Sequence, residues 1–311
     1  MKGLYLLLSA LMLMCSCAKH TTNERLSADT ATIAPEMVDF VASANNPVFK
    51  GAGPGAWDEL IRERGYILRE GDQYYMWFTG YQDKKDAVMH LGYATSADGI
   101  HWTRYENNPI VDSGWVEDVS VTKLDNTYYM FAEGRDDIAH LLTSEDRVHW
   151  KEQGPLDIRM VSGNAISKGP YGTPTAWHED NTWYLLYERG DLGVWLATST
   201  DLKVWTNKLD EPVLIPGPEV YDNYGIAVNQ VIKHKGLYYA YYHATAFEDW
   251  HAWSSCVATS LDLVHWTKYA KNPIQEENKS SPILVHDGEK YRLYTMHPEV
   301  NLHTSTLESP E

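Results

Sequence analysis

The chain has 311 residues, 43% of them hydrophobic, so it is long enough for one large folded domain or two small ones. Its formal net charge of −17 argues against a nucleic-acid partner, because phosphate binding requires clustered lysine and arginine. The same charge is unfavourable for binding anionic polymers unless a local basic site overrides it.

The N-terminal residues 1–17 are predicted to be a signal peptide. An apolar run at 4–14 is too short to span a bilayer and ends in Ser16-Cys17. This arrangement resembles a bacterial lipoprotein signal, which implies that Cys17 becomes the lipidated first residue; a plain secretory signal is the alternative. Residues 18–40 are polar and small, as in a tether. We therefore expect a protein held by lipid on a bacterial cell envelope, at the outer membrane or periplasmic face.

The pattern Ser-x-Asp-x-x-x-Trp occurs four times, at residues 96–102, 144–150, 199–205 and 260–266. Recurrence of this kind is the signature of a repeat architecture. Each Asp can hydrogen-bond the backbone two residues on, which is typical of a turn. We interpret the four Asp as fixing a turn between the third and fourth strands of each unit, and the four Trp as packing between neighbouring sheets.

Five β-hairpins are predicted, at residues 66–80, 121–134, 175–190, 231–244 and 283–297. Each is an apolar strand, a tight turn containing Gly, Asp or Asn, and a second aromatic strand. A third strand such as "HLGYATS" follows each hairpin, and an exit such as "NNPI" follows the Trp. Five four-stranded units predict an all-β, five-bladed β-propeller over residues 41–311. The last unit lacks a fourth strand, which residues 38–42 can supply.

The first strand of each propeller blade lines the axis, so the segments that lead into these strands converge on one pocket. The predicted axial positions lie seven residues before each hairpin turn and are Arg64, Asp118, Thr173, Val228 and Ser280. Only one of the five is a carboxylate.

The repeat pattern, the "NPI" exits and the aromatic hairpins of residues 45–308 resemble the five-bladed propeller glycoside hydrolases of families 43, 32 and 117. The resemblance implies three carboxylates at blade starts: a base or nucleophile, a stabilising group and an acid. It points to Asp58 in "WDEL" as the base and, by a partial match, to Asp118 in "WVEDVSV" as the second carboxylate. Thr173 stands where these enzymes carry the third, so the acid must come from elsewhere.

Three carboxylates are candidates for the acid. Glu188 and Glu133 end the second strands of blades 3 and 2, where apolar neighbours raise a carboxyl pKa. An ion pair with a nearby arginine is the alternative for each. Asp222 has the same register as Asp58, so it is either a third candidate or the cap of a repeated turn. Glu188 ranks first because its blade is the one whose start lacks a carboxylate.

Substrate contacts are expected from side chains near the pocket, because Trp, Arg and His present stacking faces and hydrogen-bond donors. The candidates are Trp57, Arg64, Trp115, Thr173, His243 and His297. Trp57 and Trp115 are the best stacking candidates among them because they lie outside the repeat pattern. Arg64 could instead hold Asp118 charged, and either His could be a packed core residue or, as the family 117 resemblance implies, an acid. Trp250 and Trp253 lie in a long blade 4 segment that can overhang the pocket.

The leading interpretation is an exo-acting glycoside hydrolase, and the family 43 resemblance implies inversion. One alternative is a glycan-binding propeller that has lost its acid, as Thr173 suggests. The other is a glycoside phosphorylase, which needs several basic groups in the pocket, and only Arg62, Arg64, Arg135 and Arg189 are evident.

The expected partner is a carbohydrate, and the protein is expected to be a monomer without a nucleic-acid partner. No cofactor is expected: the chain has no Gly-rich phosphate loop and no cysteine pair for zinc. A propeller axis can hold Ca²⁺, but no residue pattern indicates it. Once the signal peptide is removed, Cys256 is the one cysteine in the folded part, so no intrachain disulfide is expected.

Overall fold

The computed structural model describes residues 32–309 apart from 112–113 and 135–136. The signal peptide, Cys17, most of the tether and Arg135 lie outside the described residues, so lipid anchoring stays a prediction. Among the residues that are described, no helix has the length and apolar character needed to cross a membrane.

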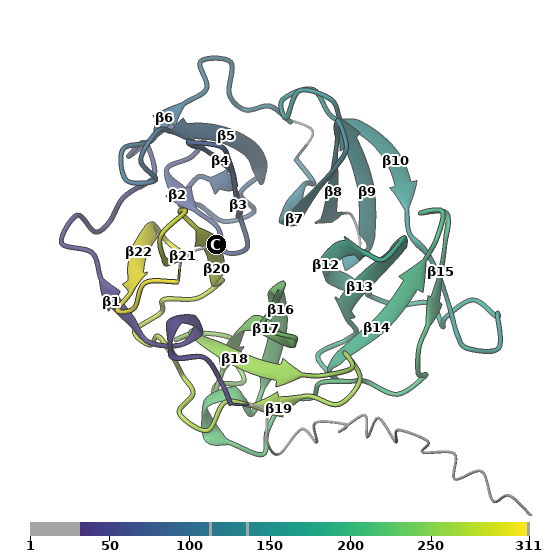
Figure 1. Cartoon of the computed structure of the whole chain (residues 1–311). Coiled ribbons are helices and arrows are strands. Elements are labelled where there is room, and N and C mark those ends of the chain that lie inside the picture. The colour runs from purple at the N-terminus through teal and green to yellow at the C-terminus, as the bar shows by residue number, and fades with distance from the viewer. Residues whose placement is uncertain (1–31, 112–113, 135–136, 310–311) are drawn as a thin grey trace, which may run out of the picture. The chain divides into compact units, whose positions relative to one another are not determined.

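The strands form five separate sheets, and Figure 1 shows them arranged in chain order around a central axis. The first blade contains β2 (Leu60–Ile61), β3 (Tyr66–Glu70), β4 (Gln73–Tyr81), β5 (His90–Ser96) and β6 (Thr103–Arg104). The second contains β7 (Glu117–Leu124), β8 (Thr127–Glu133), β9 (Ala139–Ser144) and β10 (Lys151–Pro155). The third contains β12 (Gly172–Glu179), β13 (Thr182–Glu188), β14 (Val194–Ser199) and β15 (Val204–Asn207), with β11 (Asp157–Arg159) parallel to β15.

The remaining two sheets complete the ring. The fourth contains β16 (Gly225–His234), β17 (Leu237–Thr245), β18 (Ser254–Ser260) and β19 (Thr267–Lys268), preceded by the 3-10 helix η4 (Val220–Asp222). The fifth contains β20 (Ile283–His286), β21 (Tyr291–Met296), β22 (Val300–Ser305) and β1 (Phe40–Ala42). The prediction of a five-bladed, all-β propeller is therefore confirmed.

The N-terminal segment closes the ring, as predicted. Strand β1 pairs antiparallel with β22, with Phe40 opposite Ser305, so the fifth blade takes its fourth strand from the start of the chain. Just before it, the 3-10 helix η2 (Pro35–Met37) is fastened to the fourth blade, where the Tyr241 hydroxyl donates to the Met37 carbonyl at 2.7 Å. Strand β1 therefore covers the edge that β22 would otherwise leave unpaired, and it joins the last blade to the start of the chain.

The repeated Ser-x-Asp turns have the predicted structure. In the first blade the Asp98 carboxylate accepts hydrogen bonds from the Ile100 and His101 N–H groups, both at 2.8 Å, while Ser96 Oγ accepts one from Gly99 at 2.9 Å. The same bonds recur at Asp146, Asp201 and Asp262. The Asp in each copy is therefore a turn residue and takes no part in the axial site.

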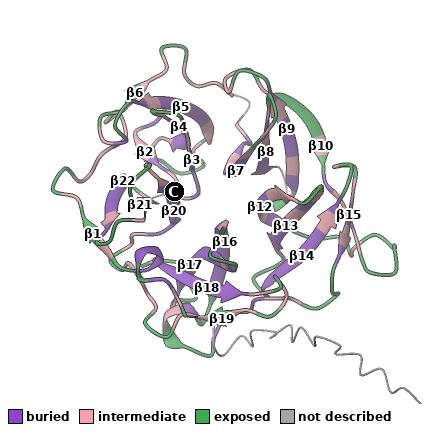
Figure 2. Cartoon of the chain, in the orientation of Figure 1, coloured by how far each residue is buried: buried purple, intermediate pink, exposed green. Residues whose placement is uncertain are grey.

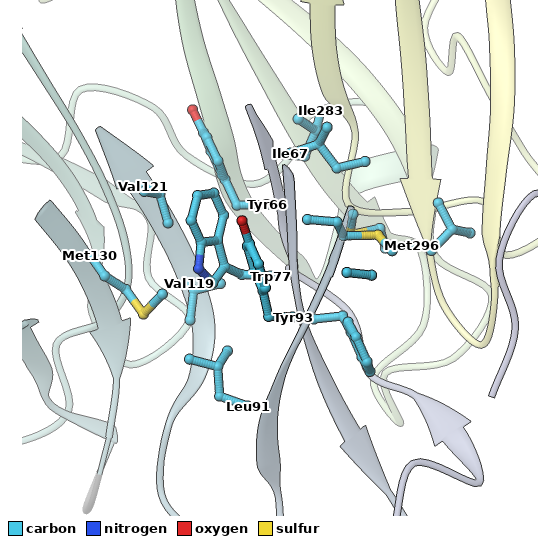
Figure 3. Packing of buried hydrophobic residues seen from close by; sticks show 14 of the residues in the cluster. Tyr66, Ile67, Trp77, Leu91, Tyr93, Val119, Val121, Met130, Ile283 and Met296 are labelled. Atoms are coloured by element: carbon cyan, nitrogen blue, oxygen red, sulfur yellow. The ribbon is translucent and has the colours of Figure 1, made fainter. Parts of the chain in front are cut away.

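The repeated tryptophans pack between neighbouring blades. Ring contacts that join two blades are Trp102 with Tyr294 at 6.3 Å, Trp150 with Trp77 at 6.1 Å, and Trp205 with Phe131 at 5.8 Å. Figure 2 shows that burial is concentrated in central strands such as β17 and β18, and Figure 3 shows Trp77 among side chains of the first two blades. Truncating such a core aromatic typically costs about 3–5 kcal/mol, so these contacts hold the ring of blades together.

Candidate active site

The first strands of the blades are irregular where the axial positions were predicted. Arg64, Asp118 and Thr173 have φ angles of 56°, 52° and 45°, in the left-handed region. Strands β7 and β12 shift register against their partners at the same point, as in a β-bulge. Left-handed non-glycine residues cost about 1–3 kcal/mol and gather at functional sites, so this ring of bulges marks where the pocket is built.

A cavity of about 280 Å³ lies at these bulges, lined by the starts of first strands and by residues at or just after the ends of second strands. Blades 2 and 3 give it an acidic wall of Asp118, Glu133, Asp137, Glu188 and Asp191. Blade 4 gives an apolar and aromatic wall of Ile226, Ala227, Trp250 and Trp253, together with His243. Of the predicted site residues, the structure brings Asp118, Glu133, Glu188, Thr173 and His243 together here.

Two glutamates of the acidic wall have raised pKa values. Burial raises the pKa of Glu188 to about 8, and the negative charges of Asp191 and Glu133 act in the same direction. Burial also raises the pKa of Glu133 to about 7, although its Oε2 accepts a 2.6 Å hydrogen bond from the Thr173 N–H. Glu133 of blade 2, rather than Glu188, therefore occupies the space beside Thr173. Both carboxyls are suited to carry a proton near neutral pH.

Asp118 is the one acid of this wall that contacts a buried arginine. Its Oδ2 lies 3.5 Å from Arg64 Nε, while Arg64 Nη1 and Nη2 donate to the carbonyls of Val228 and Pro174 at 2.5 and 3.2 Å. Burial and the charge of Glu133 raise the pKa of Asp118 well above its ordinary value, and Arg64 offsets this shift only in part. Since Arg64 is 1% exposed, it holds Asp118 and the inner strands rather than reaching a substrate.

The raised carboxyl pKa values predict a pH-dependent stability. A carboxyl whose pKa is higher in the folded state than in the unfolded chain contributes stability below pH 4.5 that is lost as the pH rises through 8. At pH 9, Glu188→Gln should therefore raise the free energy of unfolding by on the order of 2 kcal/mol, and the melting temperature with it. At pH 4.5 it should change the melting temperature little. Thermal unfolding at the two pH values measures this, and an equal shift at both would contradict it.

The positive charge at the cavity is largely compensated. Arg62, which lines the wall contributed by blade 1, lies 3.2 Å from a Glu63 oxygen and 3.0 Å from a Glu117 oxygen. His297 Nδ1 lies 3.1 Å from the other Glu63 oxygen. His297 itself is not among the cavity-lining residues. Neither His297 Nδ1 nor that Glu63 oxygen makes a hydrogen bond within the described residues. Burial lowers the pKa of His297, so a neutral imidazole packs beside Glu63 just outside the cavity.

The blade 4 wall combines a buried histidine with two indoles. The Trp253 ring meets the His243 ring edge-on at 4.7 Å, and His243 Nδ1 lies 3.2 Å from Asn229 Oδ1. Burial lowers the pKa of His243 well below its ordinary value, with Arg64 acting in the same direction. The imidazole is therefore neutral and is suited to hydrogen bonding with a sugar hydroxyl.

Asp58 and Asp222 do not line the cavity, in contrast to what the resemblance implied for the first. Arg104 Nε donates to Asp58 Oδ2 at 2.8 Å, and Lys268 forms the equivalent ion pair with Asp222. Each pair joins the start of a blade to the second residue after its repeated Trp. Both carboxylates are at most 1% exposed and already compensated. We therefore interpret both as structural members of the repeat.

We expect Asp58→Asn to destabilise the fold without impairing chemistry. The change removes an ion pair whose carboxylate is buried, which should lower the unfolding free energy by about 1–3 kcal/mol. Because Asp58 does not line the cavity, kcat should stay close to wild type. A double-mutant cycle with Arg104→Gln, read by chemical denaturation, isolates the pair. Loss of turnover in a fully folded Asp58→Asn protein would restore it as a catalytic candidate.

Trp57 and Trp115, expected to be stacking platforms, pack with the core of the protein instead, Trp115 buried and Trp57 half-buried. Trp57 stacks on Phe78 at 5.8 Å, and Trp115 is 8% exposed with its ring 5.0 Å from that of His140. Neither lines the cavity. Both residues lie outside the repeat in sequence, but they pack with the same core as the repeated residues. A position outside the repeat therefore does not indicate an exposed side chain.

The sequence analysis missed three acids of the cavity: Glu63, Asp137 and Asp191. Two of them had a signal, because the segments after the second strands of blades 2 and 3, "EGRDD" and "ERGD", share an acid a few residues beyond the glutamate. The Asp191 N–H donates to Glu188, which fixes the orientation of that carboxyl. Among the described residues, no group of three or more His, Cys, Asp or Glu is arranged to hold a metal ion.

The fold and the cavity thus define a five-bladed β-propeller with a cluster of proton-binding carboxyls on its axis. No protein-family model matches the chain. A 1,2-β-oligomannan phosphorylase from Thermoanaerobacter sp. is 28% identical over 170 residues, which cover 50% of this chain and 53% of the relative. A raffinose invertase from Escherichia coli is 27% identical over 180 residues, which cover 51% of this chain and 36% of the relative. The chain therefore matches about half or less of the length of these relatives.

Among solved structures, a glycosyl hydrolase from Bacteroides ovatus aligns with a TM-score of 0.69 at 15% sequence identity, covering 85% of this chain and 92% of the other. At this identity the likeness establishes the fold alone. The chain therefore has the five-bladed propeller fold of proteins that include glycoside hydrolases, and the sequence relatives include both a phosphorylase and a hydrolase.

Proposed function

We propose that the protein is a glycoside hydrolase whose reaction takes place in the axial cavity. The observation that carries the proposal is the presence in one cavity of Glu188 and Glu133, with pKa values raised to about 8 and 7, beside the arginine-paired Asp118. Glycosidic bond cleavage needs one carboxyl that is protonated and one that is ionised. The relatives, a phosphorylase and an invertase, support action on a glycosidic bond without choosing between the two acceptors.

Glu188 is the proposed general acid. Its raised pKa keeps it protonated at neutral pH, and the Asp191 N–H fixes one of its oxygens. The adjacent arginine does not neutralise it, because Arg189 Nη2 donates instead to Ser167 Oγ at 2.6 Å. Glu188 would donate its proton to the leaving oxygen as the glycosidic bond breaks.

Asp118 is the proposed general base. Burial raises the pKa of Asp118 as well, but Asp118 is the one of the three carboxyls in contact with an arginine, whose charge opposes that shift, so we assign the ionised state to it. Asp118 Oδ1 makes no hydrogen bond within the described residues, and the side chain lines the cavity. It would take a proton from the attacking water, which gives an inverting mechanism. Glu133 couples electrostatically to both groups and would help keep their protonation states apart.

Water, rather than phosphate, is the proposed acceptor. Six acidic side chains line the cavity: Glu63, Asp118, Glu133, Asp137, Glu188 and Asp191. Arg62 is the one Lys or Arg among the described lining residues, and two carboxylates already compensate its charge. A phosphate dianion would meet net negative charge, which disfavours its binding. This observation favours a hydrolase over a phosphorylase.

The raised pKa values also disfavour the alternative of a glycan-binding propeller without an acid, which rested on Thr173. The space beside Thr173 already holds a carboxyl, that of Glu133. The small volume of the cavity, about 280 Å³, suits one sugar ring rather than a long chain, and this supports exo action at a chain end.

The assay that tests the proposal compares acceptors. We expect the purified protein to release reducing sugar from one or more of β-1,2-mannobiose, raffinose and sucrose, or from a wider panel of neutral glycosides. The rate should be unchanged or lower in about 10 mM phosphate, a concentration about tenfold above the upper end of ordinary KM values. Formation of a sugar 1-phosphate in place of free sugar would show a phosphorylase, and binding without turnover on every glycoside would show a binding module.

Anchoring at Cys17 is proposed on the signal sequence alone. A Cys17→Ala protein is expected to lose its lipid and to leave the membrane fraction, or to fail to mature. Unchanged membrane partitioning of the variant would contradict lipidation at this residue.

A further inference from the structure

The mouth of the cavity carries an aromatic surface that the proposed acid and base do not use. Trp250 and Trp253 come from the segment between β17 and β18, and Trp250 is 47% exposed although it lines the cavity. Both indoles converge over Gly225, where an added Cβ would lie 3.6 Å from Trp253 and 3.9 Å from Trp250. With Ile226 and Ala227 beside them, the two rings make one continuous apolar wall.

The segment that presents these rings is held in place by its own hydrogen bonds. Thr245 Oγ1 donates to the His251 carbonyl at 2.7 Å and accepts from the Phe247 N–H at 3.1 Å. The Trp250 N–H donates to the Phe247 carbonyl at 3.1 Å, and the residue takes a φ of 61°. The Trp253 ring packs edge-on against the buried ring of His243, and the Trp253 N–H donates to Asn278 Oδ1 at 3.1 Å. A large aromatic side chain held exposed in a left-handed conformation indicates a surface kept for a ligand.

The acidic wall of the cavity has the complementary chemistry. Asp137, Glu188 and Asp191 of blades 2 and 3 line it, and carboxyl groups bind hydroxyls as acceptors or, when protonated, as donors. A pyranose ring has an apolar C–H face and a rim of hydroxyls, so it matches a cavity with one aromatic and one carboxyl wall. A ring that carried a carboxylate, sulfate or phosphate would instead meet like charge.

We propose that Trp250 and Trp253 form a subsite at the cavity mouth for a sugar ring of an uncharged oligosaccharide, with Trp250 as the stacking platform. The subsite lies outside the acid and base, so it holds the sugar on the leaving side of the bond. The assignment to the leaving side rests on the proposed function, whereas the binding of a neutral sugar at the indoles does not.

The test measures binding in a protein that does not turn over. Isothermal titration of the Glu188→Gln protein uses β-1,2-mannobiose and raffinose as neutral probes and digalacturonate as an anionic probe. We expect a neutral probe to bind, and Trp250→Ala in this background to weaken it about tenfold, which corresponds to on the order of 50 Å² of lost apolar contact. Trp250→Phe should recover part of the affinity, and digalacturonate should bind more weakly than the neutral probe.

Phe247→Ala is the matched control. Phe247 belongs to the same segment and is 43% exposed, but its ring stacks on His251 at 4.1 Å and does not line the cavity. It should leave the affinity unchanged. The proposal is overturned if Trp250→Ala binds like its parent, if digalacturonate binds as tightly as the neutral probes, or if no neutral probe binds. Binding that depends on Trp250 in a protein that hydrolyses no glycoside would reject the proposed function and leave the subsite standing.

Discussion

Glu188→Gln is expected to reduce kcat on natural glycosides by on the order of 10³-fold, because it removes the proton that the leaving oxygen needs. Activated aryl glycosides, whose leaving groups depart without protonation, should lose far less. The kcat/KM profile of the wild-type protein should fall on the alkaline side near pH 8, where Glu188 loses its proton, and the variant should lack that limb. Initial rates on both substrate types between pH 5 and 10 measure all three effects.

The control for this variant is Glu211→Gln, an exposed glutamate outside the cavity lining, which should behave as wild type. Because Glu133 titrates close to Glu188, the alkaline limb reports the pair, and Glu133→Gln should shift it. If Glu188→Gln slowed natural and aryl glycosides equally, or kept the alkaline limb, the role of general acid would pass to Glu133.

Asp118→Asn is expected to reduce kcat by a comparable factor, on the order of 10³, on natural and aryl glycosides alike, because water activation does not depend on the leaving group. The fold should lose some stability too, since Arg64 is left buried without its carboxylate. Thermal unfolding therefore has to accompany the kinetics, so that rates are compared per folded molecule.

Chemical rescue separates a base from a structural carboxylate in this case. In Asp118→Ala, azide can attack the sugar without losing a proton, so it should restore turnover of aryl glycosides and appear in the product as a glycosyl azide. The aryl group leaves with the bonding electrons, and the azide carbon–nitrogen bond replaces the broken one. A residue that only positioned Arg64 would give no azide product. Wild-type rates in folded Asp118→Asn would reject the assignment outright.

Much of the fold could be predicted from the sequence because its determinants are local and repeated. The Asp of each Ser-x-Asp-x-x-x-Trp copy accepts hydrogen bonds from N–H groups only two and three residues away. The turn can therefore be predicted from these few residues without knowing the rest of the fold. The hairpins have period-two patterns and short turns. Even the closing strand β1 was marked by the missing fourth strand of the last repeat.

The site was predicted only in part. Glu188, Glu133 and Asp118 line one cavity, as their places at strand ends and starts suggested. The family resemblance placed Asp58 in the same cavity. In the structure its carboxylate pairs instead with Arg104, which lies 46 residues later in the chain. Trp57 and Trp115 were placed in the cavity because they lie outside the repeat, yet Trp115 is buried in the core and Trp57 packs against it, half-buried.

The sequence by itself determined the repeat, the number of blades and which strand ends face the axis, because these depend on hydrogen bonds and side-chain alternation within short segments. Only the tertiary structure decided which carboxylate is paired and which can hold a proton. That choice depends on contacts between blades: Arg64 reaches Asp118 from blade 1, and Glu133 reaches Thr173 of blade 3. A carboxyl pKa follows from burial and from the charges around it, and neither is a property of a sequence segment.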